Sequence, residues 1–153
     1  MLCERALSRE TQGERFSEKQ MVQEKIADSW IEIEQFRLMV LRTAWLIDKH
    51  QDYKKVRADI AAIKVAMTKV LHDVASRTLH LHGSIGISDE MPFVQHLLQS
   101  YAMGLADGPT EVHKVTLAKQ VLQRYQACED VFPSYHVPAA RERALQKYGA
   151  LLP

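Results

Sequence analysis

Residues 80–113 of the chain read HLHGSIGISDEMPFVQHLLQSYAMGLADGPTEVH. A glycine-containing loop closes one helical pattern, Pro92 opens a second helix, and Asp107-Gly108-Pro109 separates that helix from a third. Proline is favoured in the first turn of a helix and glycine just beyond its end, so both loops should connect consecutive helices. The unpaired N–H groups at a helix start bind anions, and these two corners therefore predict a bound anion or cofactor.

Two long helical patterns precede this stretch. The first has Ser17 as its N-cap and Gln20 in a capping box, and its apolar stripe consists of Val22, Ile26, Trp30, Ile33, Val40, Ala44 and Ile47. The second follows Asp52 as N-cap and runs to about His82, and its stripe consists of Val56, Ile60, Ile63, Met67, Val70 and Val74. The short connection at residues 50–52 predicts that the two helices are antiparallel neighbours.

The remaining helices are shorter. We expect the end of a helix at residues 2–8, a helix from Pro92 to about Leu105, another from Pro109 to about Gln126, and a last one at residues 139–148 after a proline-rich segment. No strand and no internal repeat is expected. The sequence therefore predicts an all-α fold, an up-and-down four-helix bundle over residues 1–127, with a tail at 128–153 that carries a short docking helix.

Composition excludes several classes of protein. The chain has 153 residues, 46% of them hydrophobic and 25% charged, and its formal charge of +1 argues against nucleic-acid binding. No apolar run is long enough to span a membrane and no signal peptide is recognisable, so a cytoplasmic location is expected, or an organelle matrix if the native chain starts upstream. Cys3 and Cys128 lie far apart, which favours reduced thiols.

A metal site is not predicted. No glutamate is followed by histidine three positions later, which excludes the paired motif of di-iron bundles. His80 and His82 are two residues apart and cannot share a helical face.

Residues 80–92 resemble the double-glycine loop of the acyl-CoA dehydrogenase family. The spacing from Pro92 to Asp107 also matches this family, and residues 106–113 resemble the subgroup with Ala-Asp-Gly-Pro-x-Glu-Val-His, in which aspartate replaces the usual catalytic glutamate. The resemblance covers about residues 2–126 and implies a flavoenzyme that uses FAD to oxidise an acyl-CoA to its 2,3-enoyl-CoA. It also implies that Asp107 removes the alpha proton, although Asp-Gly-Pro before a helix is also common turn chemistry.

The same resemblance implies a set of cofactor contacts. Arg9 and Thr11 match a segment that holds the flavin pyrophosphate from a neighbouring subunit, although Gln12 stands where the family usually has phenylalanine. The other residues placed near the cofactor are Gln20, His80, which replaces a glutamine, Gly83, Ser84, Gly108 and Thr110. An arginine fork binds phosphate with two hydrogen bonds, and glycine lets backbone approach a ligand closely.

The resemblance reaches only the carboxy-terminal helical domain of such enzymes. The amino-terminal helical domain and the β-domain would come from the same longer gene product or from a partner chain, in a homo- or hetero-oligomer. Whether this chain alone is active stays open. The alternative from another class is a catalytically silent helical interaction domain that docks on an intact dehydrogenase.

Overall fold

The structure is a computed structural model that describes residues 1–128 and 135–151. The chain forms two compact units, Met1–Val121 and Leu122–Pro153, and each is described by itself. The boundary that we placed at residues 127–128 stays a prediction.

Helices dominate the described residues, which confirms the predicted all-α class. In chain order the elements are α1 Leu2–Ser8, β1 Glu10–Thr11, β2 Glu14–Arg15, the 3-10 helix η1 Phe16–Glu18, α2 Gln20–His50, α3 Arg57–His82, the 3-10 helix η2 Gly83–Ile87, α4 Phe93–Leu105, α5 Thr110–Leu122, α6 Val137–Tyr148 and the 3-10 helix η3 Gly149–Leu151. The two-residue strands pair antiparallel in a small hairpin that the sequence did not predict. Gln12 and Gly13 turn this hairpin, both with positive φ.

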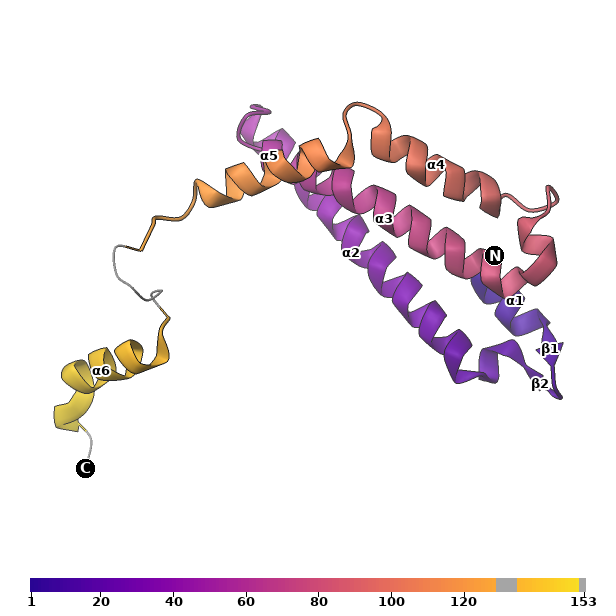
Figure 1. The fold of residues 1–153 in the computed structure, drawn as a ribbon, viewed down its shortest axis with the longest axis horizontal. Helices are drawn as coiled ribbons and strands as arrows, with labels where there is room; N and C mark the ends of the chain where they lie inside the picture. The colour runs from indigo at the N-terminus through magenta and orange to yellow at the C-terminus, as the bar shows by residue number, and fades with distance from the viewer. Residues whose placement is uncertain (129–134, 152–153) are drawn as a thin grey trace. The chain divides into compact units, whose positions relative to one another are not determined.

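Helix α3 is the centre of the first unit. Helices α2 and α4 both pack along it, and α1 covers its C-terminal end (Figure 1). The buried cluster at this end consists of Leu2, Ala6, Val22 and Leu81, with Phe16 and Ile26 packed against it. Buried alanines at positions 58, 61 and 75 let the neighbouring backbones approach α3 closely.

Both predicted N-caps are wrong. Helix α2 begins at Gln20 behind Lys19, because Phe16 packs on the buried cluster and residues 16–18 form η1; Ser17 only accepts a hydrogen bond at its carbonyl from Gln23. Helix α3 begins at Arg57, because the Asp52 carboxylate accepts the Lys54 N–H in a turn of its own.

The stripe predicted for α2 is also partly wrong. Trp30 is 66% exposed, whereas Ser29 and Thr43 are buried on the face towards the rest of the unit. The small polar side chains bond to carbonyls one turn earlier in their own helix, so they tolerate burial where the helices approach most closely.

Helix α5 ends at Leu122 rather than near Gln126, and none of its residues is buried. A thirteen-residue helix without a buried face has little tertiary support, which explains an early end.

In the second unit α6 begins two residues before the predicted position, with Pro138 in its first turn. Phe132 and Pro133, which belong to the segment predicted not to be helical, lie outside the described residues, and the docking of α6 stays a prediction.

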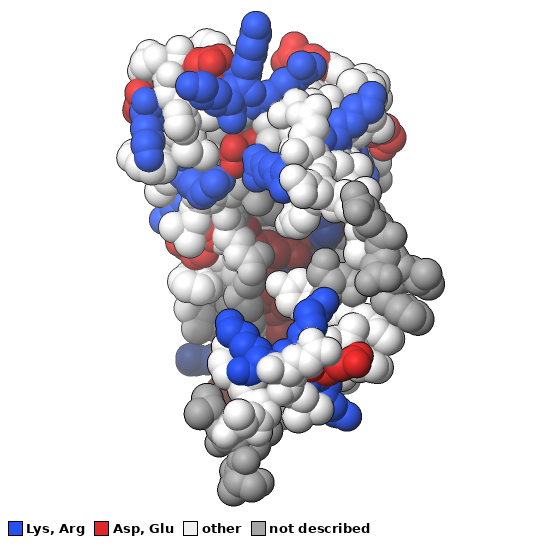
Figure 2. Space-filling model, turned by 90° about the vertical axis from the view of Figure 1, so that its left-hand side faces the viewer, with Lys and Arg blue, Asp and Glu red and all other residues white. Residues whose placement is uncertain are grey.

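Figure 2 shows Lys and Arg side chains with Asp and Glu side chains among them on the face in view. In the described part of the chain, no helix is both long and apolar enough to cross a membrane.

Candidate functional site at the turn between α4 and α5

Asp107 lies in the turn that joins α4 to α5, and its side chain is exposed. Its φ of 54° is in the left-handed region, which costs a residue other than glycine free energy and which aspartate tolerates better than most. The turn is tied on both sides: the Asp107 carbonyl accepts a hydrogen bond from His113 Nε2 at 3.2 Å, and Thr110 Oγ1 donates to the Gly104 carbonyl at 3.2 Å. The strained residue is therefore held by its surroundings rather than by its own preference.

Gly108 and Thr110, the other two predicted site residues of this turn, have separate structural roles. Gly108 has φ 103°, a conformation that side chains rarely adopt, and a Cβ there would lie 3.4 Å from His113 Nε2. The Thr110 hydroxyl is engaged by Gly104, so its contact with a ligand would require a second hydrogen bond. Both residues hold the turn whether or not a cofactor binds beside it.

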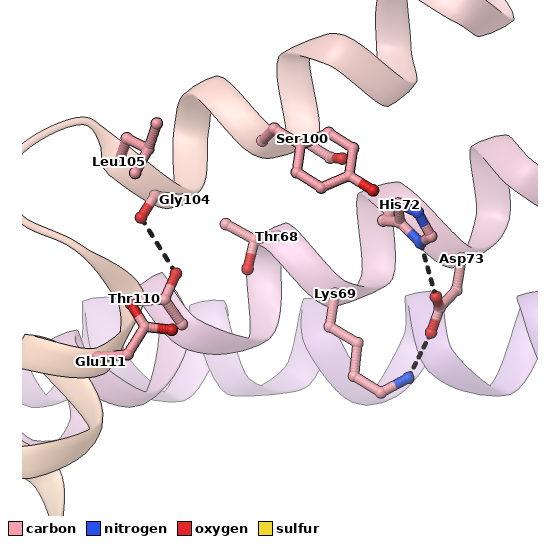
Figure 3. A pocket seen from close by; sticks show the side chains of 10 residues that line it. Thr68, Lys69, His72, Asp73, Ser100, Gly104, Leu105, Thr110 and Glu111 are labelled. Atoms are coloured by element: carbon pink, nitrogen blue, oxygen red, sulfur yellow. Dashed lines mark hydrogen bonds and ion pairs between the residues drawn. The ribbon is translucent and has the colours of Figure 1, made fainter.

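A cavity of about 350 Å³ lies beside this turn. Figure 3 shows side chains from α3, α4 and the start of α5 around it, and the lining consists of Thr68, Lys69, His72, Asp73, Ser100, Tyr101, Gly104, Leu105, Thr110 and Glu111. Leu105 and Thr110 flank the Asp107 turn in sequence, so the cavity reaches both sides of that turn. Concave sites of this size between helices commonly bind small molecules.

Three titratable side chains form a connected group on one wall of the cavity. Asp73 contacts Lys69 and accepts a hydrogen bond from His72 Nδ1 at 3.0 Å (Figure 3), and the Tyr101 ring meets the His72 ring edge-on at 5.7 Å. Burial raises the pKa of Asp73, but the hydrogen bonds from Lys69 and His72 outweigh it and leave this pKa below its ordinary value. The same bond with Asp73 raises the pKa of Lys69. At neutral pH Asp73 is therefore an ionised hydrogen-bond acceptor, not a proton donor.

Gly83, Ser84 and His80 lie at the opposite end of α4. Gly83 caps α3 with φ 66° and ψ −140°, a backbone conformation essentially restricted to glycine, and no atom lies within 4 Å of the position of a Cβ. His80 and Ser84 are exposed beside it. The surface above this bend is thus open to a ligand.

Arg9 is the C-cap of α1, Thr11 lies in β1 and Gln20 begins α2, and these elements lie at this same end (Figure 1). The Arg9 guanidinium lies 5.5 Å from the centroid of the Phe16 ring, a cation–π contact, and the residue is exposed. Thr11 is half-buried and Gln20 is exposed.

The predicted site residues therefore form two groups, which the structure does not bring together in one chain. Thirteen residues of α4 separate the bend at Gly83 from Asp107, a length of about 20 Å at 1.5 Å per residue. That both groups line one flavin in a completed assembly stays a prediction. Sequence reasoning also missed the cavity group, whose one signal was the spacing of Lys69 and Asp73 on one helical face.

Among the residues that the structure describes, no group of three or more His, Cys, Asp or Glu side chains is arranged to hold a metal ion.

Comparison with known proteins gives one consistent result. Residues 2–122 match the family model of the acyl-CoA dehydrogenase C-terminal domain. The chain is 38% identical over 124 residues to (R)-benzylsuccinyl-CoA dehydrogenase of Thauera aromatica, covering 80% of this chain and 30% of that protein. A solved structure from Mycobacterium abscessus, assigned as an acyl-CoA dehydrogenase, superposes with a TM-score of 0.77 at 34% identity over 82% of this chain and 30% of that one.

A flavin-containing neighbour also has this fold. The FAD complex of PigA superposes with a TM-score of 0.73 at 27% identity, covering 81% of this chain and 32% of that one. The present chain spans about a third of the length of these proteins. Since the family model matches most of its residues, the chain belongs to the acyl-CoA dehydrogenase family, through the C-terminal helical domain.

Proposed function

We propose that this chain is the C-terminal part of a flavin-dependent acyl-CoA dehydrogenase, in which Asp107 takes the alpha proton of an acyl-CoA thioester. The observation that carries this proposal is the exposed carboxylate held in a left-handed turn beside a concave cavity. Backbone strain of this kind persists where the surroundings enforce it, and it clusters at functional sites. The exposed carboxylate has room to reach a substrate C–H supplied from outside the unit.

Two carbon–hydrogen bonds break in this reaction. The proton on the alpha carbon moves to an Asp107 oxygen, the electron pair left behind forms the new double bond, and the hydrogen on the beta carbon leaves as hydride. When bound, the flavin supplies the acceptor for that hydride. The tied turn fixes Asp107, and the apolar part of the neighbouring cavity, including Leu105, offers a place for methylene groups of the substrate.

The residues at the other end fit the phosphate part of a flavin dinucleotide. The open space above Gly83 admits a ligand to the backbone, Ser84 offers a hydroxyl, and the exposed Arg9 fork suits a pyrophosphate. Because this group lies about one α4 length from Asp107, it would serve a cofactor bound mainly by a neighbouring subunit.

A second function is favoured by one observation, that Asp107 is exposed and that α5 has no buried residue in this chain. It is a silent interaction domain that docks on an intact dehydrogenase through these same surfaces. The two functions differ in whether the assembled protein needs the Asp107 carboxylate.

A chimeric enzyme distinguishes the two candidate functions. Residues 2–122 of this chain replace the matching segment of the Thauera (R)-benzylsuccinyl-CoA dehydrogenase, which supplies the rest of an enzyme. The proposal predicts bound flavin, judged by absorbance, and dye reduction dependent on (R)-benzylsuccinyl-CoA. Asp107→Asn should then lower kcat by about 10²–10⁴-fold with unchanged flavin content, because general base catalysis contributes that much.

Asp89→Asn is the matched control, since Asp89 is also exposed but lies near the other end of α4. If both variants retain full turnover, Asp107 is not the base, and the silent-domain function is favoured.

A further inference from the structure

The hydroxyl groups that line the cavity beside the Asp107 turn can only accept hydrogen bonds from a ligand. Thr68, Ser100 and Thr110 each donate their one hydroxyl hydrogen to a backbone carbonyl of α3 or α4, at 3.0, 2.6 and 3.2 Å respectively. A hydroxyl has a single hydrogen and two acceptor lone pairs. Each of these oxygens therefore keeps acceptor capacity and has no donor left.

The imidazole on the cavity wall is in the same situation. His72 Nδ1 donates to the ionised Asp73 at 3.0 Å, so the neutral ring keeps a lone pair at Nε2. The lining side chains with donors left are Lys69, whose ammonium already contacts Asp73, and Tyr101. Because acceptors outnumber donors on the wall, a ligand that satisfies this cavity has to bring hydrogen-bond donors.

The charge of the cavity also favours a donor. Lys69 and Asp73 compensate each other, whereas Glu111 is exposed and has no ion-pair partner among the residues that the structure describes. With His72 neutral, the cavity has one net negative charge, located on Glu111. Figure 3 shows Glu111 beside Thr110 at one end of the cavity, away from Asp73.

We infer that this cavity binds a small aliphatic amine in its ammonium form, with the ammonium against Glu111. An ammonium has three donors and no acceptor. The Glu111 carboxylate and the hydroxyl oxygens of Thr110 and Thr68 provide three acceptor groups for it. The two threonines meet at Gly104, where an added Cβ would lie 3.3 Å from Thr110 Oγ1 and 3.6 Å from Thr68 Cγ2.

The aliphatic part of the ligand has apolar surface to cover. Leu105 and Tyr101 line the cavity and are 70% and 64% exposed, and methylene groups of an amine would remove part of this surface from water. The proposed function gives the same apolar surface to methylene groups of the substrate. The inference does not rest on that function, because amine binding requires neither flavin nor turnover.

The first experiment titrates the full chain with hexylamine, hexanol and hexanoate, followed by NMR of the backbone amides. The three probes share one alkyl chain and differ in the head group. Hexylamine should shift the amides around Thr68, Gly104 and Thr110 and bind at least about 10-fold more tightly than hexanol, as expected for a hydrogen bond to a charged group. Hexanoate should bind most weakly. Absence of shifts around the cavity, or equal affinities of the three probes, overturns the inference.

The second experiment changes the cavity charge in both directions. Glu111→Gln keeps the shape of the side chain and should weaken hexylamine binding by about 10-fold. Lys69→Met removes the one cation of the wall and should tighten hexylamine binding by about 2–5-fold, the range for exposed charges. The control is Glu90→Gln, because Glu90 is exposed near the other end of α4, and it should leave the affinity unchanged.

A variant that merely disturbed the cavity would weaken binding in every case. Weaker binding by Lys69→Met, or an unchanged affinity in Glu111→Gln, therefore overturns the inference. Circular dichroism verifies that all three variants remain folded.

Discussion

The two ends of α4 are built in opposite ways. At its start, Phe93 is buried against the His82 ring, with centroids 4.6 Å apart. Leu81, the neighbour of His82, belongs to the buried cluster with Leu2 and Ala6 of α1. At its end, Asp107 is exposed and no residue of α5 is buried. The first end folds on contacts within the chain, whereas the second presents a tied but uncovered turn. This contrast suits a domain that brings a stable scaffold to an active site completed by other segments.

The largest effect that we expect on stability is at the packed end. Gly86 lies in η2, where an added Cβ would be 2.4 Å from the Leu79 carbonyl oxygen and 3.1 Å from His82 Cβ. Neither α3 backbone nor a buried histidine can move aside easily, so Gly86→Ala should lower the free energy of unfolding by about 3 kcal/mol or more. Urea denaturation followed by circular dichroism measures it.

Gly149→Ala is the control, because no atom lies within 4 Å of a Cβ at that position and its φ of −58° is ordinary. A loss below about 0.5 kcal/mol in Gly86→Ala would show that the η2 end is loosely packed, and the contrast between the two ends would disappear.

The next effect concerns the ion pair between Arg77 of α3 and Glu32 of α2, which we call the clamp. Arg77 donates to both Glu32 oxygens, at 2.7 and 3.0 Å, and the two side chains are only 20% and 24% exposed. Arg77→Leu should cost about 1–2 kcal/mol at pH 7, the range for charge-assisted hydrogen bonds that are partly shielded from water. Urea titrations of the parent chain and the variant at several pH values measure it.

The pH dependence has a definite sign. The hydrogen bond from Arg77 lowers the pKa of Glu32 from its ordinary 4.5, so the pair stabilises the fold above that pH and loses this contribution as pH falls through the lowered value. The difference between the parent chain and Arg77→Leu should therefore shrink in acid. Glu32→Gln should remove the same pH-dependent part; a difference that stays constant to pH values well below 4.5 would mean that the clamp acts only through packing.

How much of this the sequence could predict depends on the range of the interactions. Helix periodicity predicts α2, α3 and α4, because each pattern repeats within one element. The start of α2 was mispredicted because Phe16, four residues earlier, packs on a cluster from other helices. Trp30 is predicted to be buried because its position fits the helical period as well as the positions of the buried side chains do. It is 66% exposed.

The candidate site divides in the same way. The Asp107 turn could be found from a local motif, since its residues are consecutive. The cavity beside it could not, because Thr68, Tyr101 and Thr110 come from three helices and only the packing of α3 against α4 brings them together. The separation of Gly83 from Asp107 follows from the length of α4 and could have been calculated from the predicted helix.

A smaller effect is expected at the uncovered end. Asp107→Gly removes a side chain from a left-handed backbone, and the fold should be unchanged or more stable by up to about 1 kcal/mol, because glycine adopts positive φ without strain. Thermal unfolding measures it. Gln51→Gly is the control at another left-handed position, with φ 49° at the end of α2, and should behave alike. A clear loss in Asp107→Gly alone would mean that this carboxylate holds the fold, contrary to a functional role.

The smallest effect is expected on the cavity wall. Lys69 is 72% exposed, and its contact with Asp73 is an exposed pair one helical turn apart, so Lys69→Met should change stability by less than about 0.5 kcal/mol. The titration of Asp73 should change instead. Burial raises its pKa while Lys69 and His72 lower it, so the loss of Lys69 should move this pKa upward. NMR titration of the Asp73 carboxyl measures the shift, with Lys64→Met as control, because Lys64 bonds to the Met103 carbonyl instead. A stability loss as large as that of Arg77→Leu would show that the cavity wall is as firmly built as the clamp on the packed side.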